Sequence, residues 1–203
     1  MTPHIDAHDA DLQPPPPPPP PPQSAPRLPA SNKNRCWDWI LVPGNMHWAK
    51  NRSSFRTYRR APSRIDNNRV LGVGTVELRV RRAPDDDRPN TLVLEDVLHM
   101  PGAVCNGLCL GKYREGNPGD DLEVGGDGEG ERCHCQVWSE GREHGEALWY
   151  GEEYHGCSRV ALWGDPRGSS GLGDRDRAGM SGVDASAEEL DTLYTRVRDR
   201  SLV

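Results

Sequence analysis

The sequence is poor in aromatic side chains and in long apolar runs. Aromatic residues make up 6% of the 203 residues, phenylalanine occurs once, and hydrophobic residues account for 34%. No stretch approaches the roughly 18 consecutive apolar residues that a membrane span requires. The opening stretch MTPHIDAHDAD has acidic side chains and no apolar core, unlike a secretory signal. We therefore expect a soluble intracellular protein, cytoplasmic or nuclear, whose six cysteines stay reduced.

Glycine and proline, by contrast, are abundant, with 22 and 19 residues. The length suits one domain of ordinary size with tails, and this composition indicates that part of the chain does not enter a packed core. Residues 1–35 are predicted to form a disordered proline-rich tail. The unbroken run from Pro14 to Pro22 favours an extended polyproline II helix. Such a run is either a ligand for proline-recognition domains, such as SH3 or WW domains, or a low-complexity spacer.

The formal net charge is -6, so the chain as a whole is not built to bind polyanions. One basic segment, residues 50–69, departs from this balance and has Phe55 and Tyr58 interleaved with its cations. That combination predicts either a nucleic-acid-binding surface, which grips phosphates and stacks bases, or a solvated arginine-rich face. The residues that would carry nucleic-acid binding are Lys50, Arg52, Arg56, Arg59 and Arg60.

The hydrophobic pattern from residue 37 onward is that of β-strands. Val76, Leu78 and Val80 alternate with charged residues, which is the period of a strand with one buried face. Residues 92–98 form a second such strand after a polar loop, and short apolar pieces recur up to residue 163. The glycines in Gly72-Val73-Gly74 predict a bulge or a close backbone approach. Many short strands with turn signals between them indicate a mainly β fold, a small barrel or a sandwich.

The composition divides the rest of the chain into segments. The folded domain is predicted to span residues 36–165, with a solvated acidic and glycine-rich insertion at 115–132. A flexible linker is predicted at 166–183. Residues 184–203 are predicted to form an amphipathic helix, because Ser186 and Glu189 have the spacing of a capping box. An apolar stripe at helical spacing follows, formed by Leu190, Leu193, Tyr194 and Val197.

The stretch DWILVPGNMHWAKNRSSF, residues 38–55, combines a buried strand with a tight turn at Pro43-Gly44. In several hydrolase classes a catalytic residue lies at the end of such a strand. Here the positions are occupied by Val42, Pro43 and Gly44, and no side chain among them can transfer a proton. His47 and His99 are interpreted as structural histidines, because no acyl-transfer motif surrounds them.

Three blocks of sequence, taken in order, resemble one known family. The first is Asp38–Phe55, the second is Gly72–Val76, and the third is Leu94–Gly102, followed by Cys109-Leu110-Gly111. Together they resemble the β-barrel domain of copia-type, TNT-like retrotransposon Pol polyproteins, which is related to the retropepsin-like aspartic proteases. The resemblance implies a small closed barrel that spans residues 37 to 113 and is completed by the later strands.

The resemblance also implies that catalysis has been lost. The family has Asp-Ser-Gly where this chain has Val42-Pro43-Gly44, and the segment from Gly44 to His47 is one residue shorter. An aspartic protease needs two carboxylates that share a proton across a water, one from each subunit of a dimer. The sequence contains no Asp-Ser-Gly or Asp-Thr-Gly. We therefore expect a transposon-derived pseudoprotease that acts at most as a binding module; a degenerate gene fragment without selected function is the other interpretation.

The cysteines provide a weak metal signal. Cys133, Cys135 and Cys157, with nearby histidines, are potential ligands, and Cys105 and Cys109 have workable spacing. Zinc sites normally use pairs of the form Cys-x2-4-Cys, and Cys105 and Cys109 fall at core positions of the resembling family. No metal site and no cofactor are predicted.

Overall fold

The computed structural model of the chain describes residues 35–126, 133–140, 145–164, 170, 172 and 181–199. The proline run and nearly all of the predicted tail lie outside the described residues. Strands predominate, which confirms the prediction of a mainly β fold. The elements in chain order are β1 (Trp39–Val42), β2 (Trp48–Ala49), η1 (Arg52–Ser54), β3 (Phe55–Ile65), β4 (Asn68–Ala83), β5 (Asp86–His99), β6 (Asn106–Cys109), α1 (Leu110–Gly116), β7 (Asp120–Gly126), β8 (Cys133–Ser139), β9 (Ala147–Tyr154), β10 (Cys157–Val160) and α2 (Ala187–Asp199).

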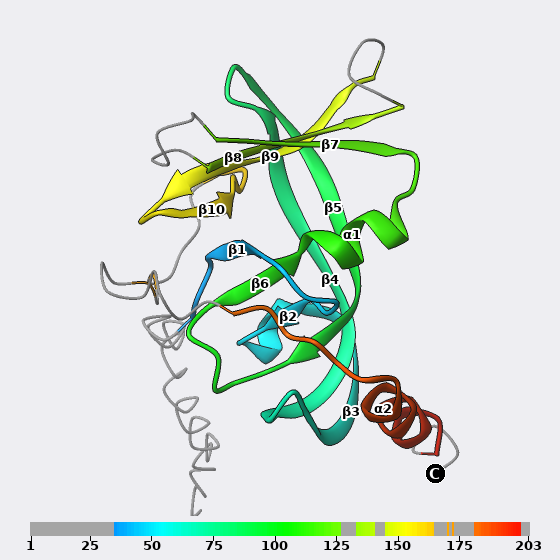
Figure 1. The fold of residues 1–203 in the computed structure, drawn as a ribbon. Coiled ribbons are helices and arrows are strands. Elements are labelled where there is room, and N and C mark those ends of the chain that lie inside the picture. The colour runs from blue at the N-terminus through cyan, green and yellow to red at the C-terminus, as the bar shows by residue number, and fades with distance from the viewer. Residues whose placement is uncertain are drawn as a thin grey trace, which may run out of the picture. The chain divides into compact units, whose positions relative to one another are not determined.

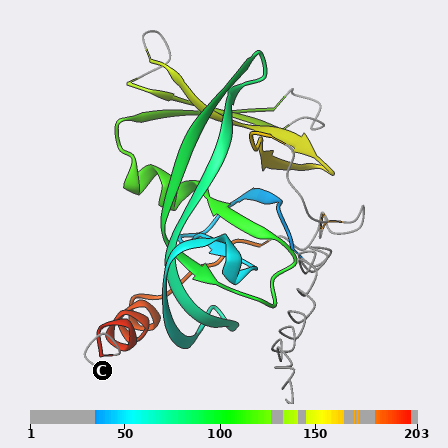
Figure 2. The same ribbon diagram turned by 180° about the vertical axis from the view of Figure 1, so that it is seen from behind.

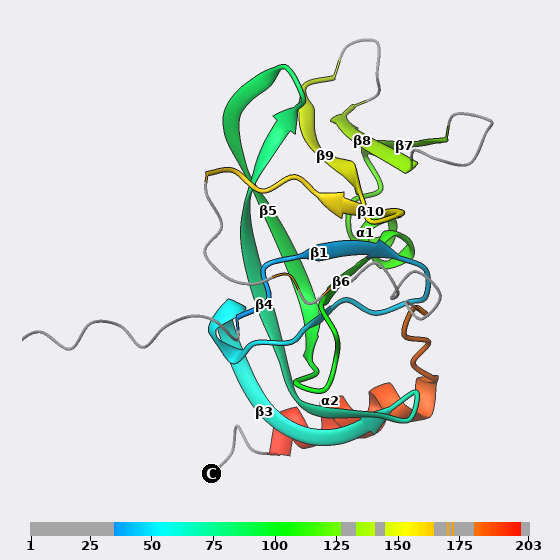
Figure 3. The same ribbon diagram turned by 90° about the vertical axis from the view of Figure 1, so that its left-hand side faces the viewer.

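The ten strands form one sheet in the order β3-β4-β5-β2-β6-β1-β10-β9-β8-β7 (Figures 1 and 3). β3 and β7 lie at its two edges, so the described strands form an open sheet. The closed barrel that the sequence predicted is not shown by this strand order. Neither described helix is long and apolar enough to cross a membrane.

β1 lies inside the sheet and is covered on both faces. It runs parallel to β6, with Val42 opposite Cys109, and antiparallel to β10. Ile40 and Val42 enter one core cluster, whereas Trp39 enters a second one with Trp149. A strand buried on both faces has a continuous apolar sequence rather than an alternating one. This explains the run Trp-Ile-Leu-Val.

β3, β4 and β5 are long antiparallel strands at one side of the sheet (Figure 2). The polar loop predicted between the second pair is only a turn at residues 84–85, because both strands extend to it. The close backbone approach at the glycines is confirmed: a Cβ on Gly74 would lie 2.1 Å from the carbonyl oxygen of Thr57. Residues 55–65, predicted only as a basic surface, form the edge strand β3.

The predicted insertion at residues 115–132 is wrong over its first part. α1 extends to Gly116, and β7 pairs with β8 along its whole length, with Val124 opposite Cys135. Leu122 and Val124 alternate with acidic residues, but the surrounding Gly and Asp obscured this strand period. Residues 127–132 lie outside the described residues.

The C-terminal helix is confirmed as α2, which lies along β3 (Figures 1 and 3). The Ser186 Oγ accepts a hydrogen bond from the Glu189 backbone N–H at 3.2 Å, and the Glu189 carboxylate accepts one from the Ser186 N–H at 2.8 Å. Leu193 is fully buried in the first core cluster, and Leu190 and Val197 pack against that cluster. The predicted linker is too long at its C-terminal end, because residues 181–183 already pack on the turn after β1.

Candidate functional site

The turn after β1 is where the sequence placed the degenerate catalytic loop. Val42 is only 2% exposed and belongs to the first core cluster, while Pro43 is exposed. Gly44 has a φ of 98°, in the left-handed region that favours glycine. A Cβ on Gly44 would lie 2.6 Å from the carbonyl oxygen of Val183. The glycine is therefore required by both its conformation and the segment packed against it.

An extended segment, residues 181–185, lies on this turn. Val183 forms a parallel bridge with Gly44, and its carbonyl accepts a hydrogen bond from the Asn45 N–H at 3.0 Å. The Asn45 side chain then bonds both backbone groups of Ala185: Oδ1 accepts from its N–H and Nδ2 donates to its carbonyl, each at 2.8 Å. The side chains of Val183 and Ala185 are buried. The turn thus holds an extended backbone by direct hydrogen bonds.

The same turn is tied to the junction of β6 and α1. The Cys109 thiol donates to the Gly44 carbonyl at 2.8 Å, and the Cys109 backbone N–H donates to the His47 Nδ1 at 3.0 Å. Burial raises the pKa of the Cys109 thiol, which keeps it protonated and able to donate. Cys109, the last residue of β6, therefore links this strand to the turn by two hydrogen bonds.

Asp38 directly precedes β1 and so lies at the opposite end of the strand from the turn. Its Oδ1 accepts a hydrogen bond from Arg159 at 3.2 Å. In the part of the chain that the structure describes, the hydrogen bonds of the turn go to backbone groups and to the Cys109 thiol, and no carboxylate takes part. The described turn has no group that could act as the general base of an aspartic protease.

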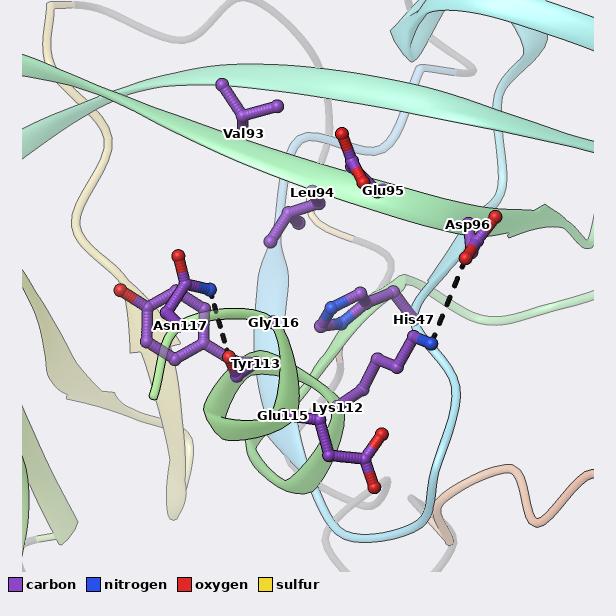
Figure 4. A pocket seen from close by; sticks show the side chains of 10 residues that line it. All are labelled: His47, Val93, Leu94, Glu95, Asp96, Lys112, Tyr113, Glu115, Gly116 and Asn117. Carbon is purple, nitrogen blue, oxygen red and sulfur yellow. Dashed lines mark hydrogen bonds and ion pairs between the residues drawn. The ribbon is translucent and has the colours of Figure 1, made fainter. Parts of the chain in front are cut away.

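Behind the turn lies a pocket of about 390 Å³ between β5, α1 and His47 (Figure 4). Glu95 and Asp96 of β5 form one wall, and Lys112 and Glu115 of α1 form part of the other. Lys112 Nζ lies 3.9 Å from the Asp96 carboxylate. The pocket thus combines three carboxylates with one ammonium group.

His47 lines this pocket although it is only 3% exposed. Burial, followed by the charge of Lys112, lowers its pKa from 6.5 to about 4, so the ring is neutral at physiological pH. Because Nδ1 accepts the Cys109 N–H, the ring proton must lie on Nε2. Among the described residues Nε2 has no hydrogen-bond partner. His47 therefore presents the N–H of a neutral ring to the pocket.

Asp96 connects this pocket with its surroundings. Its φ of 53° accompanies a register shift between β4 and β5, at the point where the pairing passes from Gly74 to Val76. On the other side of Glu95 and Asp96 lies a second pocket, which is lined also by Tyr194 of α2. Burial, followed by the Asp96 carboxylate, raises the pKa of Tyr194 to about 12. Asp96 thus lies between α1 and α2.

The basic residues of segment 50–69 lie in different surroundings, some beside Tyr58 and one at the second pocket. Arg52 stacks over the Tyr58 ring at 4.0 Å, and the charges of Arg52 and Arg60 both act on Tyr58. Arg59 instead lines the second pocket beside Asp96. This division follows from the alternation of side chains along β3.

The other two basic residues are engaged within the chain. Lys50 Nζ donates to the Val104 carbonyl at 3.2 Å, and Arg56 forms an ion pair with Glu77 of β4. The structure therefore does not bring the five predicted nucleic-acid-binding residues to one face.

The candidate metal ligands are spread through the fold. Cys105 belongs to the first core cluster and Cys135 to the second, where burial raises the pKa of its thiol to about 12. Within the described part of the chain, no group of three His, Cys, Asp or Glu side chains is placed to hold a metal ion. The side chains of Cys133 and His134 lie outside the described residues.

No family model, no curated protein and no solved structure matches the chain. The site therefore has to be interpreted from its own geometry. Sequence reasoning missed Asn45, whose partner Ala185 is 140 residues away, and the pocket carboxylate Asp96. Neither carries a local sequence signal, because each acquires its surroundings only from tertiary structure.

Proposed function

We propose that the chain is a catalytically inactive, retropepsin-like domain derived from a copia-type Pol polyprotein, and that it binds extended peptide segments at the turn Pro43–Asn45. The observation that carries the peptide-binding part is the seating of residues 181–185 on this turn. Asn45 pairs with a backbone N–H and a backbone carbonyl of the same residue, which any extended peptide presents. Backbone pairing of this kind supplies affinity, and side-chain pockets add specificity.

Two features support the retropepsin-like part of the proposal. The turn follows a buried strand at the position of the family's Asp-Ser-Gly, as the order of the three sequence blocks implies. The chain after β10 also reaches back to β4, since Leu162 forms an antiparallel bridge with Val80. This contact brings two distant parts of the open sheet together. The Arg81 N–H donates to the Ala161 carbonyl and the Trp163 N–H to the Arg79 carbonyl, each at 2.9 Å.

Peptide binding accounts for the geometry better than nucleic-acid binding. Base stacking needs an accessible aromatic face, and the Tyr58 ring is already stacked against Arg52 and has edge contacts with Phe55 and His99. The turn at Asn45, by contrast, already holds an extended backbone. We therefore propose peptide binding rather than nucleic-acid binding as the function.

The test uses the full chain and a fluorescein-labelled peptide of residues 181–199. Val183→Lys places a charge at a buried position of the chain's own segment, which should release that segment from the turn. We expect the peptide to bind the Val183→Lys chain at least about tenfold more tightly than the original chain, measured by fluorescence anisotropy. Adding Asn45→Ala to Val183→Lys should abolish that gain.

Ala185→Lys opens the same segment at a different residue and replaces Val183→Lys if that variant does not fold by circular dichroism. Equal peptide binding with and without Asn45→Ala would overturn the proposal. Failure of both opened variants to bind the peptide would overturn it as well, and would favour a degenerate fragment without selected function.

A further inference from the structure

Residues 181–185 lie on the turn after β1 in a defined direction and register. The parallel bridge between Val183 and Gly44 sets the direction. Three hydrogen bonds set the register: the Asn45 N–H donates to the Val183 carbonyl at 3.0 Å, and the Asn45 side chain pairs with both backbone groups of Ala185 at 2.8 Å. A peptide that makes the same hydrogen bonds therefore places each of its side chains at a defined position on the turn.

The position of Gly182 has no room for a side chain. A Cβ on Gly182 would lie 2.9 Å from the Gly44 nitrogen and closer still to the carbonyl carbon and oxygen of Pro43. All three are backbone atoms of the turn, so no change of a side-chain rotamer can move them away. The φ of Gly182 lies outside the left-handed region, and other residues can adopt such a φ. Glycine is therefore required here by lack of space and not by backbone conformation.

The other positions of this segment differ in their exposure. Val183 is 2% exposed and Ala185 is 7% exposed, and both side chains belong to the first core cluster. Asp184 between them is exposed, and so is Ser181. A charge at position 183 would be buried among apolar side chains, and a large side chain at position 185 would overpack the cluster. The turn therefore favours a compact apolar residue at 183 and a small residue at 185.

We propose that the turn selects extended peptides with the sequence glycine, compact aliphatic residue, any residue, small residue, of which Gly-Val-Asp-Ala in this chain is one example. The inference rests on the proposed peptide binding at the turn and adds the class of peptide that binds. Glycine is the strictest position, because its neighbours are backbone atoms, whereas surrounding side chains relax in part. Gly44 has the same role on the side of the turn, since a Cβ there would lie 2.9 Å from the Val183 nitrogen. Each backbone thus approaches the other at a glycine.

The test compares fluorescein-labelled peptides of residues 181–199 on the opened Val183→Lys chain by fluorescence anisotropy. Gly182→Ala in the peptide should weaken binding at least about tenfold, although alanine restricts the free peptide and would otherwise favour binding. Val183→Asp and Ala185→Leu in the peptide should each weaken binding at least about fivefold. Asp184→Ala is the matched control, because it places alanine at the exposed position, and should change the dissociation constant less than about threefold.

The same substitution made in the chain should have the opposite effect. Gly182→Ala in the full chain should release its own segment, so that the unmodified peptide binds this variant at least about tenfold more tightly than the original chain. The Asp184→Ala chain should bind the peptide no better than the original chain does. If the Gly182→Ala chain does not fold by circular dichroism, the peptide series alone decides.

The recognised sequence and the proposed function can fail separately. If the unmodified peptide binds neither the Val183→Lys chain nor the Ala185→Lys chain, the proposed function is overturned and the recognised sequence with it. If the unmodified peptide binds but the Gly182→Ala peptide binds equally well, only the recognised sequence is overturned. A loss with the Asp184→Ala peptide as large as that with Gly182→Ala would also overturn it, as would unchanged binding of the Val183→Asp or Ala185→Leu peptide.

Discussion

The turn after β1 and the pocket behind it differ in the hydrogen-bond partners of their polar groups. At the turn, Asn45 and the Gly44 carbonyl are bonded to Ala185 and Cys109 of the same chain. In the pocket, the Nε2 of His47 has no hydrogen-bond partner among the described residues, and the Asp96 carboxylate lies 3.9 Å from Lys112 Nζ. The polar groups of the turn are thus paired within the chain. The polar groups of the open pocket can instead be satisfied by water, so the two sites differ in whether the chain itself or the solvent supplies the partner.

The largest expected effect comes from Val42→Asp, which introduces at the turn the acidic residue that the resembling family has there. Val42 is 2% exposed and packs in the first core cluster, which consists of apolar side chains. An uncompensated buried carboxylate should lower the free energy of unfolding by about 3–5 kcal/mol. We expect this loss in urea denaturation, and no peptide cleavage between about pH 3 and 7, the range that suits a shared-proton carboxylate pair.

Val42→Ala is the control for Val42→Asp, because it removes methyl groups without adding charge and should cost less. Pepstatin-sensitive cleavage by the Val42→Asp chain would contradict the pseudoprotease interpretation. It would show that the shortened segment to His47 still positions an aspartate for catalysis.

The pocket should make stability depend on pH through His47. Its folded-state pKa is about 4, below the ordinary value of 6.5, so the unfolded chain binds the proton more readily. The stabilisation is therefore fully present above pH 6.5 and is lost as the pH falls toward 4. The loss across this window should be on the order of 3 kcal/mol, measured by urea denaturation at several pH values.

His47→Gln should flatten this part of the pH dependence, since it removes the titrating ring. His155→Gln removes an exposed histidine from the turn between β9 and β10 and should leave the slope unchanged. An equal slope in the original chain and in His47→Gln would mean that other groups cause the acid sensitivity. It would contradict the interpretation that burial keeps the His47 ring neutral.

The sequence alone was enough to predict features that depend on residues close together in the chain. The alternation of Val76, Leu78 and Val80 gave the strand β4, and the spacing of Ser186 and Glu189 gave the start of α2. The close backbone approach at Gly74 also followed from residue type. Each of these signals lies within a few residues, where side-chain periodicity and capping act directly.

Features that depend on strand order could not be predicted in the same way. The open sheet places β1 between β6 and β10, and no local pattern specifies that order. β7 escaped prediction because its Gly- and Asp-rich composition outweighed the alternation of Leu122 and Val124. The pocket needed three separate segments, which carry His47, Asp96 and Lys112, to be brought together by the fold.

The smallest expected effect tests how firmly the covering segment is held at the turn. Ser186 caps α2 directly after residues 181–185, and its Oγ accepts the Glu189 N–H. Ser186→Ala should lower the free energy of unfolding by about 1 kcal/mol, the usual cost of losing a capping side chain. Thr192→Ala, at an exposed position within α2, is the matched control and should cause no loss, since alanine favours the helix. If both variants unfold at the same urea concentration as the original chain, the cap does not hold the segment. The Glu189 contact with the Asp66 N–H, at 2.9 Å, would then suffice to keep α2 and the covering segment in place.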